Sequence, residues 1–157
     1  MDRDITLPTQ WGKFNLRAGA IIICNNKLLM VKSDNTEYIY SVGGRIKMGE
    51  SSEEAVLREV YEETGIHASV DRLGFIHENF FVDSRLGGAY HEIAFFYYIK
   101  DFDEKLMKCD STNALGESES LCWLSLDKLD SYKFYPEFFK THLRNPSSDT
   151  IRIVTRE

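Results

Sequence analysis

The segment Gly43–Ile66 constrains the fold more than any other part of this sequence. It reads GGRIKMGESSEEAVLREVYEETGI, a loop that carries glycines followed by an acidic segment of helix-forming residues. Ser51 and Glu54 have the spacing of a capping box, and Gly65 is placed as a left-handed stop after the last turn. These signals predict a helix that runs roughly over Ser52–Thr64.

Acidic residues cluster near the C-terminal end of this predicted helix. Glu59, Glu62 and Glu63 lie at i, i+3 and i+4, so they share a face that spans roughly 100°. That end of a helix is already negative, and a sequence selected for stability alone would carry Lys or Arg there. A divalent cation bound by oxygen ligands would turn the repulsion between these carboxylates into attraction. The opposite arc carries the residues that we expect to be buried: Val56, Leu57, Val60 and Tyr61.

The same segment resembles the signature of the Nudix family, G-x5-E-x7-R-E-U-x-E-E-x-G-U, in which U is apolar. The fixed positions are filled, in order, by Gly44, Glu50, Arg58, Glu59, Val60, Glu62, Glu63, Gly65 and Ile66. A solvated acidic helix face, the ordinary meaning of a Glu cluster, would not explain the spaced glycines or the Arg before the Glu. Many family members have Pro before the glycine pair, where this chain has Val42. The resemblance is strict over 43–66 and looser from Arg17 to about Leu143.

The resemblance implies a metal site formed by Glu59, Glu62, Glu63 and a backbone carbonyl at Gly43. An all-carboxylate site of this kind selects hard cations, Mg²⁺ or Mn²⁺, over zinc. Metals bound there would neutralise a diphosphate and lower the pKa of a bound water, which attacks phosphorus in line. Glu59 and Glu119 are both candidates for the base, and the sequence does not decide between them. Glu63 is also expected to be essential for catalysis.

Other motif residues are expected to support this site. Arg58 is expected to pair with a metal-binding carboxylate and fix its orientation, and we count it with the catalytic residues. An ordinary salt bridge at the start of the helix is the alternative for Arg58 and Glu50. The positions with a supporting role in loop and helix are Gly44, Glu50 and Gly65.

Candidates outside the fixed positions of the motif rest on weaker signals. Arg45 and Lys47, in the glycine-bearing loop, are candidate substrate-binding residues for phosphate, although exposed basic loop residues are more often solvated. Glu119 is the first candidate for a further acid from the region before residues 121–124, and Glu117 the second. Glu78 and Glu92 either face the cleft or are outward polar residues of alternating strands, which is the reading we favour.

Composition sets the class of protein. The chain has 157 residues, 43% of them hydrophobic and 28% charged, which suits one globular domain. Its net charge of −6 disfavours broad nucleic-acid binding, because no basic surplus exists to neutralise phosphates. Cys24, Cys109 and Cys122 are expected to be free or buried thiols. With no apolar signal segment and no run long enough to span a membrane, we expect a cytoplasmic protein.

Apolar and β-branched runs on both sides of the helix predict strands. The predicted strands cover residues 17–24, 27–32, 73–82, 90–100, 121–124 and an alternating tail at 151–155, with short helices at 125–129 and from Tyr135–Pro136. Residues 102–116 read as a loop of the kind that sets substrate choice. This order, together with the resemblance, predicts an α/β fold: the Nudix α/β/α sandwich with a mixed sheet. We expect a single domain over 1–157, with a lead-in at 1–16 and a tail at 146–157.

The predicted function is metal-dependent hydrolysis of a phosphoanhydride bond in a nucleoside diphosphate linked to another moiety. Nucleoside triphosphates, nucleotide sugars, dinucleoside polyphosphates and capped RNA all remain open as substrates, with size and charge favouring a small nucleotide. A Nudix-type domain that senses a nucleotide without turnover is the alternative, and isomerase chemistry on an isoprenoid diphosphate ranks lower. A homodimer is also consistent with the resemblance.

Overall fold

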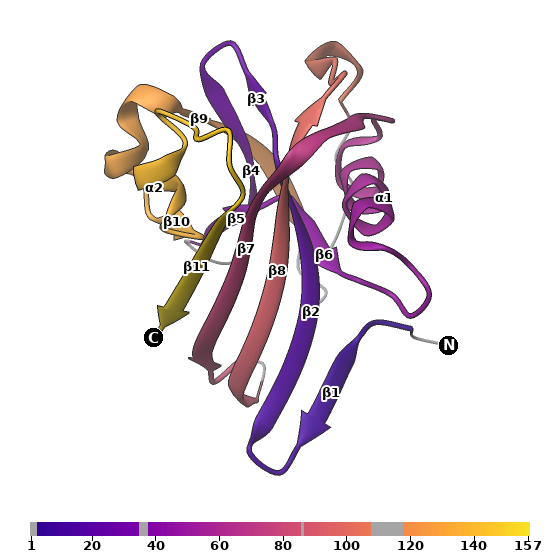
Figure 1. Ribbon diagram of the computed structural model, residues 1–157. Coiled ribbons are helices and arrows are strands. Elements are labelled where there is room, and N and C mark those ends of the chain that lie inside the picture. The colour runs from indigo at the N-terminus through magenta and orange to yellow at the C-terminus, as the bar shows by residue number, and fades with distance from the viewer. Residues whose placement is uncertain (1–2, 35–37, 86, 108–117) are drawn as a thin grey trace.

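A computed structural model of the chain describes residues 3–34, 38–85, 87–107 and 118–157. Strands dominate it, with one long helix between the sixth and seventh strands (Figure 1). The strands are β1 (Thr6–Thr9), β2 (Gly12–Ile21), β3 (Ile23–Cys24), β4 (Lys27–Ser33), β5 (Ile39–Ser41), β6 (Gly43–Arg45), β7 (Ser69–Asp83), β8 (Gly88–Lys100), β9 (Glu119–Ser125), β10 (Phe134–Tyr135) and β11 (Ile151–Arg156). The helices are α1 (Ser52–Thr64) and α2 (Phe139–His142), with 3₁₀ segments at Glu104–Leu106 and Leu126–Ser131.

The strands divide between two mixed sheets. The first has the order β1-β2-β8-β7-β11, with β6 added on β2, and the second has the order β10-β5-β4-β3, with β9 added on β4. Strand β2 runs parallel to β8, and β11 runs parallel to β7, whereas β7 and β8 form a long antiparallel hairpin. The predicted α/β class with mixed strand directions is therefore confirmed. Among the described residues, no helix is long and apolar enough to cross a membrane.

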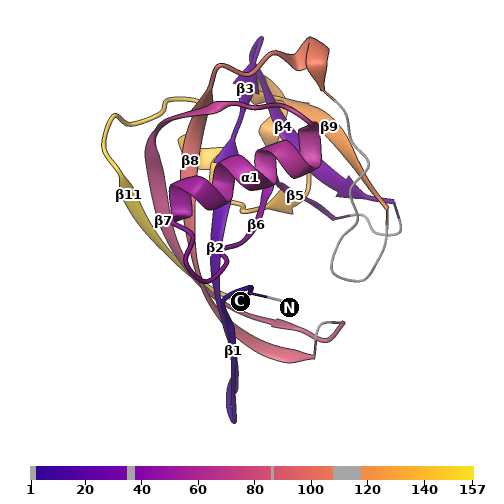
Figure 2. The ribbon, with the colours of Figure 1, turned by 90° about the vertical axis from the view of Figure 1, so that its right-hand side faces the viewer.

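Two apolar cores lie on opposite faces of the first sheet. Successive residues of a strand point to opposite faces, so Phe96 of β8 packs into one core and Tyr97 into the other. The core that contains Phe96 also holds Phe139 of α2, and the core that contains Tyr97 holds Val56 of α1. Helix α1 thus covers one face of this sheet, as Figures 1 and 2 show from two directions.

Helix α1 has the bounds that the sequence predicts. The Ser51 side chain accepts a hydrogen bond from the Glu54 N–H, and the Glu54 carboxylate accepts one from the Ser51 N–H, which completes the capping box. Gly65 ends the helix in the left-handed conformation at φ 75°. The prediction that Tyr61 is buried is wrong: Tyr61 is 46% exposed and stacks on His67 at 4.2 Å between ring centroids, because it lies at the edge of the apolar arc.

Elsewhere in the chain, a predicted turn and a predicted strand are confirmed, whereas two predicted boundaries differ from the structure. The predicted turn at Asn25 and Asn26 is confirmed, with positive φ at both residues, and the tail forms β11 beside β7. Residues 12–16, assigned to the lead-in, belong to β2. A helix opening at Pro136 is wrong: α2 begins at Phe139, because Phe134 and Tyr135 pair with β5 as a strand.

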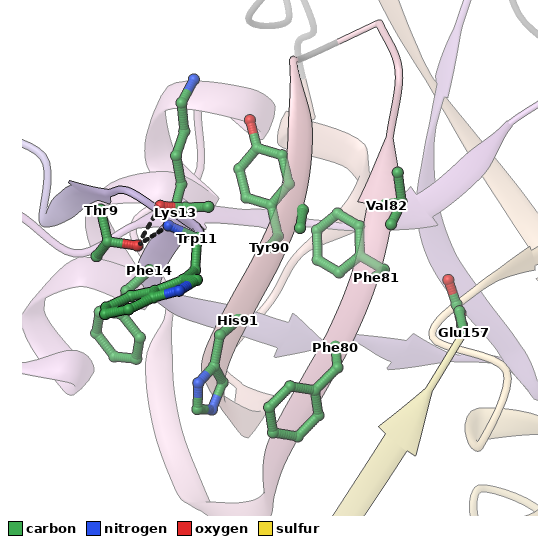
Figure 3. Close-up of a pocket in the computed structure, with 12 residues that line it drawn as sticks. Thr9, Trp11, Lys13, Phe14, Phe80, Phe81, Val82, Tyr90, His91 and Glu157 are labelled. Carbon is green, nitrogen blue, oxygen red and sulfur yellow. Dashed lines mark hydrogen bonds between the residues drawn. The ribbon is translucent and has the colours of Figure 1, made fainter.

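A shallow groove of about 410 Å³ lies at the outer end of the β7–β8 hairpin. Aromatic side chains of three strands form it: Phe14, Phe80, Phe81, Tyr90 and His91, with Trp11 beside them on the β1–β2 turn (Figure 3). Trp11 is 81% exposed. No residue that lines this groove belongs to the segment 43–66, so the groove is separate from the motif described above.

Candidate active site

Strand β6 carries no side chain where the acidic end of α1 approaches it. Gly43 pairs with Gly19 of β2, and Gly44 pairs with Ala18. A side chain at Gly44 would occupy the position of the Glu59 carboxylate, and one at Gly43 would collide with the carbonyl of Ala18. The glycine pair therefore provides the space into which the carboxylates of α1 extend.

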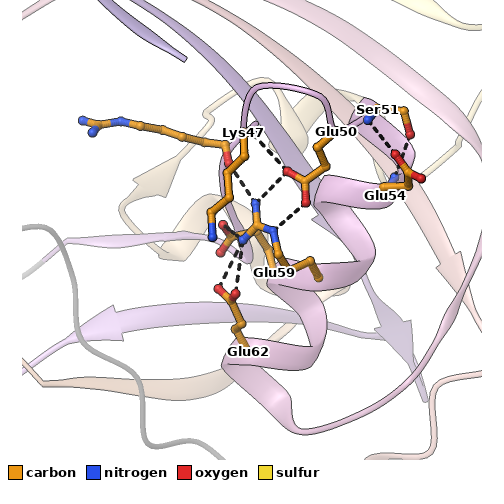
Figure 4. A network of polar contacts seen from close by, with 8 residues as sticks. Lys47, Glu50, Ser51, Glu54, Glu59 and Glu62 are labelled. Carbon is orange, nitrogen blue, oxygen red and sulfur yellow. Dashed lines mark hydrogen bonds and ion pairs between the residues drawn. The ribbon is translucent and has the colours of Figure 1, made fainter. Parts of the chain in front are cut away.

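Arg58 holds three carboxylates and a backbone carbonyl in one network. Its Nε donates to Oε1 of Glu50 at 2.6 Å, and its Nη2 donates to Oε2 of Glu50 at 3.0 Å. Nη1 donates to Glu59 at 2.7 Å and to Glu62 at 3.2 Å, and Nη2 also donates to the carbonyl of Arg45 at 3.0 Å. Figure 4 shows Glu50, Glu59 and Glu62 turned toward this network. The two hydrogen bonds to Glu50 hold the pKa of that carboxyl below its usual range.

Glu63 is the most deeply buried acid of the motif, at 7% exposure. Its Oε1 accepts a hydrogen bond from the Gly43 N–H at 3.4 Å, and its Oε2 is buried with no hydrogen-bond partner in the described part of the chain. Burial raises the pKa of Glu63 well above the usual range, and the charges of Glu59 and Glu119 raise it further. The pKa of Glu59 is raised as well, chiefly by burial, despite its bond to Arg58.

These observations fit a divalent cation. Glu63 has a buried oxygen with no partner among the described residues, and the charges of two more carboxylates act on it. A buried anion without compensation costs roughly several kcal/mol unless a cation or proton neutralises it. The donors are all oxygens, which Mg²⁺ and Mn²⁺ prefer. Within the described ranges, however, no three His, Cys, Asp or Glu side chains are already arranged as a metal site. Glu59 and Glu62 face Arg58 instead, so metal binding would require them to turn.

A fourth acid reaches this region from the second sheet. Glu119 begins β9, and its Oε1 accepts a hydrogen bond from the Tyr40 hydroxyl of β5 at 2.5 Å. The charge of Glu119 raises the pKa of Glu63, at the acidic end of α1. The candidate acid Glu117 lies outside the described residues.

The loop cations predicted to bind substrate take different positions. Arg45 lies 4.0 Å from Asp4, measured between Nη1 and Oδ2. The backbone N–H of Lys47 donates to Glu50 at 3.0 Å, and its side chain points toward the end of the helix that carries Glu59 (Figure 4). The structure thus brings Lys47 closer to the acidic cluster than the sequence alone indicates.

Sequence reasoning missed two residues of this region. Tyr40 contacts Glu119 across 79 positions of sequence, and Arg17 of β2 lowers the pKa of both Glu59 and Glu63 by its charge. Arg17 is the first residue of the predicted strand at residues 17–24 and lies within β2, and this position gave only a weak signal. Nothing local in the sequence marks Tyr40, because its partner Glu119 lies on β9, a strand that is distant in the sequence.

Comparison with known protein families identifies the class of protein. Residues 13–142 match the NUDIX domain family, which covers most of the chain. The chain therefore belongs to the Nudix hydrolase family, as its motif predicted.

Solved structures share the fold. A NUDIX hydrolase from Nitrosomonas europaea is 26% identical, with a TM-score of 0.53 over 75% of this chain and 76% of its own. The solution structure of the E. coli ORF135 protein is 25% identical, with a TM-score of 0.56 over 79% of this chain and 82% of its own. A MutT protein from Bacillus halodurans, at 19% identity and a TM-score of 0.63 over 90% of this chain and 89% of its own, supports the fold alone.

One curated relative adds a local sequence match. It comes from Bacillus subtilis (strain 168), carries the name "Putative 8-oxo-dGTP diphosphatase", and is 42% identical over 55 residues. These residues make up 33% of this chain, and the match spans only 37% of the length of that relative.

Proposed function

We propose that this protein hydrolyses a pyrophosphate bond in a nucleoside diphosphate linked to another moiety, and that it uses Mg²⁺ or Mn²⁺. The observation that carries the proposal is the buried Oε2 of Glu63, which has no hydrogen-bond partner in the described ranges of the chain. It lies among acids and beside a backbone that carries no side chains at Gly43 and Gly44. A group that is costly in the absence of a cation is expected where a cation is part of the function.

Glu59, Glu62 and Glu63 would hold the metal, with the backbone carbonyl of Gly43 as a further ligand. When bound, the metal supplies charge neutralisation of the diphosphate and a more acidic water. Arg58 has a positioning role, because its bonds to Glu50 fix the guanidinium that in turn orients Glu59 and Glu62.

Glu119 and Glu59 are the two candidates for the group that accepts the proton of the attacking water. The Tyr40 hydroxyl donates to Oε1 of Glu119, and this hydrogen bond holds the Glu119 carboxylate in one orientation. Glu59 is oriented in a similar way by Arg58. Replacing Glu119 by Gln separates them, because loss of the base removes the acidic limb of the pH–rate profile, whereas Glu59→Gln would also remove a metal ligand.

The substrate that we propose is a small nucleotide, either a nucleoside triphosphate or a nucleotide sugar. The name of the Bacillus subtilis relative makes oxidised purine triphosphates, 8-oxo-dGTP first, the leading members of a test panel. The excess of acidic residues in this chain, at net charge −6, favours a small ligand whose charge a metal neutralises over a long polyanion.

The test is phosphate or pyrophosphate release from such a panel, with Mg²⁺, with Mn²⁺ and with EDTA. We expect turnover that depends on metal in the wild type and none in Glu63→Gln. Glu53→Gln is the matched control, because Glu53 lies exposed in the first turn of the same helix. Tight nucleotide binding without turnover would favour the sensing domain instead, and full activity in Glu63→Gln would remove the metal-site assignment.

A further inference from the structure

Arg17 lies beside the glycines of the site on the first sheet. It pairs with Arg45 of β6, and Gly19, two residues on, pairs with Gly43. Residues two apart in a strand, and residues directly opposite one another, share a face of the sheet. Arg17 therefore shares a face with Gly19 and Gly43, and this face points away from α1, because a side chain at Gly19 would meet Phe96. The N–H of Gly43, on the neighbouring strand, bonds Glu63.

The positive charge of Arg17 acts on three separate groups of the site. It lowers the pKa of Glu59 and of Glu63 on α1, and the pKa of Tyr40 on β5, against the larger effect of burial in each case. Arg17 nevertheless forms no ion pair with these groups in the described part of the chain. Among the residues that the structure describes, its one ion-pair contact is with Glu92, at 3.9 Å between Nε and Oε2.

Arg17 and Arg58 differ in how their donors are used. Every nitrogen of the Arg58 guanidinium donates to a carboxylate or a carbonyl. A guanidinium carries five N–H donors, and the loose contact of Arg17 occupies only its Nε side. The side chain of Arg17 is 33% exposed, so a ligand that approaches from solvent can reach it.

A buried pair on neighbouring strands fixes the stem of Arg17. Asn15 and Glu92 lie opposite one another on β2 and β8, and Nδ2 of Asn15 donates to Oε2 of Glu92 at 3.5 Å. Asn15 is 3% exposed, and the Glu92 side chain is 14% exposed. This pair is a polar support on the sheet beside the Nε of Arg17, and within the described ranges neither Nη nitrogen of Arg17 donates a hydrogen bond.

We infer that Arg17 binds a phosphate of the nucleotide from the sheet side of the site, opposite the carboxylates of α1. Arginine binds phosphate through two parallel N–H···O bonds, which needs a guanidinium whose donors are not already used. Arg17 meets that condition and Arg58 does not. The inference deepens the proposed function and rests on it, because the phosphate is that of the same substrate.

The test compares Arg17→Gln, Arg17→Lys and the wild type. Arg152→Gln is the matched control, since Arg152 lies on the far sheet edge and its side chain is 73% exposed. Calorimetry measures Mn²⁺ alone and then inorganic pyrophosphate at saturating Mn²⁺, and kinetics on the best panel substrate give KM and kcat. Thermal melting of each variant reports whether it is folded.

We expect pyrophosphate to bind at least about tenfold more weakly to Arg17→Gln, with a matching rise in KM, because charge-assisted bonds are lost. Arg17→Lys keeps the charge but lacks the planar, paired donors of a guanidinium, so its loss of pyrophosphate affinity should be intermediate. Mn²⁺ alone should bind Arg17→Gln as tightly as the wild type or more tightly, because a cation near the carboxylates is gone.

Wild-type affinity for pyrophosphate in both variants would overturn the inference while leaving the proposed function intact. Equal weakening of Mn²⁺ and pyrophosphate would also overturn it, because it would show that Arg17 only maintains the shape of the site. If Arg17→Gln does not fold, the pyrophosphate affinity of Arg17→Lys decides. Absence of turnover and of metal binding in the wild type would instead contradict the proposed function itself.

Discussion

The Gly43 N–H donates to Oε1 of Glu63 at 3.4 Å, whereas Oε2 of the same carboxylate is buried with no hydrogen-bond partner among the residues that the structure describes. One long hydrogen bond is weak compensation for a carboxylate that is 7% exposed. The stability of the metal-free protein therefore does not explain why position 63 carries a Glu. A cation bound to Glu63 would supply the compensation that this hydrogen bond does not.

Replacing Arg58 by Ala should destabilise the fold as well as the site. Glu50, Glu59 and Glu62 would lose their shared cation, and the first two are largely buried, with 16% and 14% of their side chains exposed. We expect the free energy of unfolding to fall by about 2–3 kcal/mol, discounted from the fully buried case for partial exposure. Urea denaturation measures it, and Arg58→Lys should lose about half as much. A loss below about 0.5 kcal/mol would show that the network is not stabilising.

Two Gly→Ala substitutions should have different effects, one on metal affinity at the site and the other on the stability of the core. A methyl group at Gly44 meets the flexible Glu59 carboxylate, so Gly44→Ala should displace that side chain and lower metal affinity while changing the melting temperature little. A methyl group at Gly19 meets the ring of Phe96 inside the core, so Gly19→Ala should lower the melting temperature. Calorimetry with Mn²⁺ and thermal melting are measured for both. Wild-type metal affinity in Gly44→Ala would contradict the placement of Glu59.

Tyr40→Phe should slow turnover without weakening binding. The substitution removes the hydroxyl that donates to Glu119 at 2.5 Å and keeps the ring. If Glu119 is the base, kcat should fall about tenfold with KM unchanged, because the carboxylate is less well oriented. Steady-state kinetics and the pH–rate profile measure this, with Glu119→Gln for comparison. Full activity in both Tyr40→Phe and Glu119→Gln would exclude Glu119 as the base and leave Glu59 as the candidate.

His77 should make stability depend on pH. Burial lowers the pKa of His77 from 6.5 to about 4, and the ring bonds the Thr155 hydroxyl at 2.9 Å. Between these two values the unfolded chain binds the proton more readily than the folded one, so stability is fully present above pH 6.5 and is lost as pH falls toward 4. We expect His77→Gln to flatten this part of the curve of unfolding free energy against pH. Identical slopes in both proteins would contradict it.

Much of the fold was predictable because its signals are local. Ser51, Glu54 and Gly65 determine both ends of α1 without reference to the rest of the chain, and Asn25–Asn26 does the same for a turn. The prediction that Tyr61 is buried was wrong because helical periodicity assigns a residue to one arc of the helix. It does not show how far the sheet that covers this arc extends. The short α2 was misplaced because Tyr135 pairs with β5, a contact that no local signal reports.

The candidate site divides in the same way. Glu59, Glu62 and Glu63 share one helix, so their spacing alone places them together. Glu119 was named from the strand that follows it, whereas Tyr40 was missed. Arg17 was missed because it reaches the site through the pairing of β2 with β6, which joins residues more than two dozen positions apart. Register between distant strands depends on the packing of the whole sheet, which a local pattern does not contain.

Metal binding tests the central claim most directly, and calorimetric titration of the wild type, Glu63→Gln and the control Glu53→Gln with Mg²⁺ and Mn²⁺ measures it. A non-hydrolysable nucleoside diphosphate is present in a second series, and thermal melting accompanies each titration. We predict saturable binding and a raised melting temperature in the wild type and in Glu53→Gln, with both effects lost in Glu63→Gln, because a ligand of the folded state stabilises it. If neither metal gives binding heat in the wild type, and melting is unaffected by either metal with the nucleotide present, the account is contradicted.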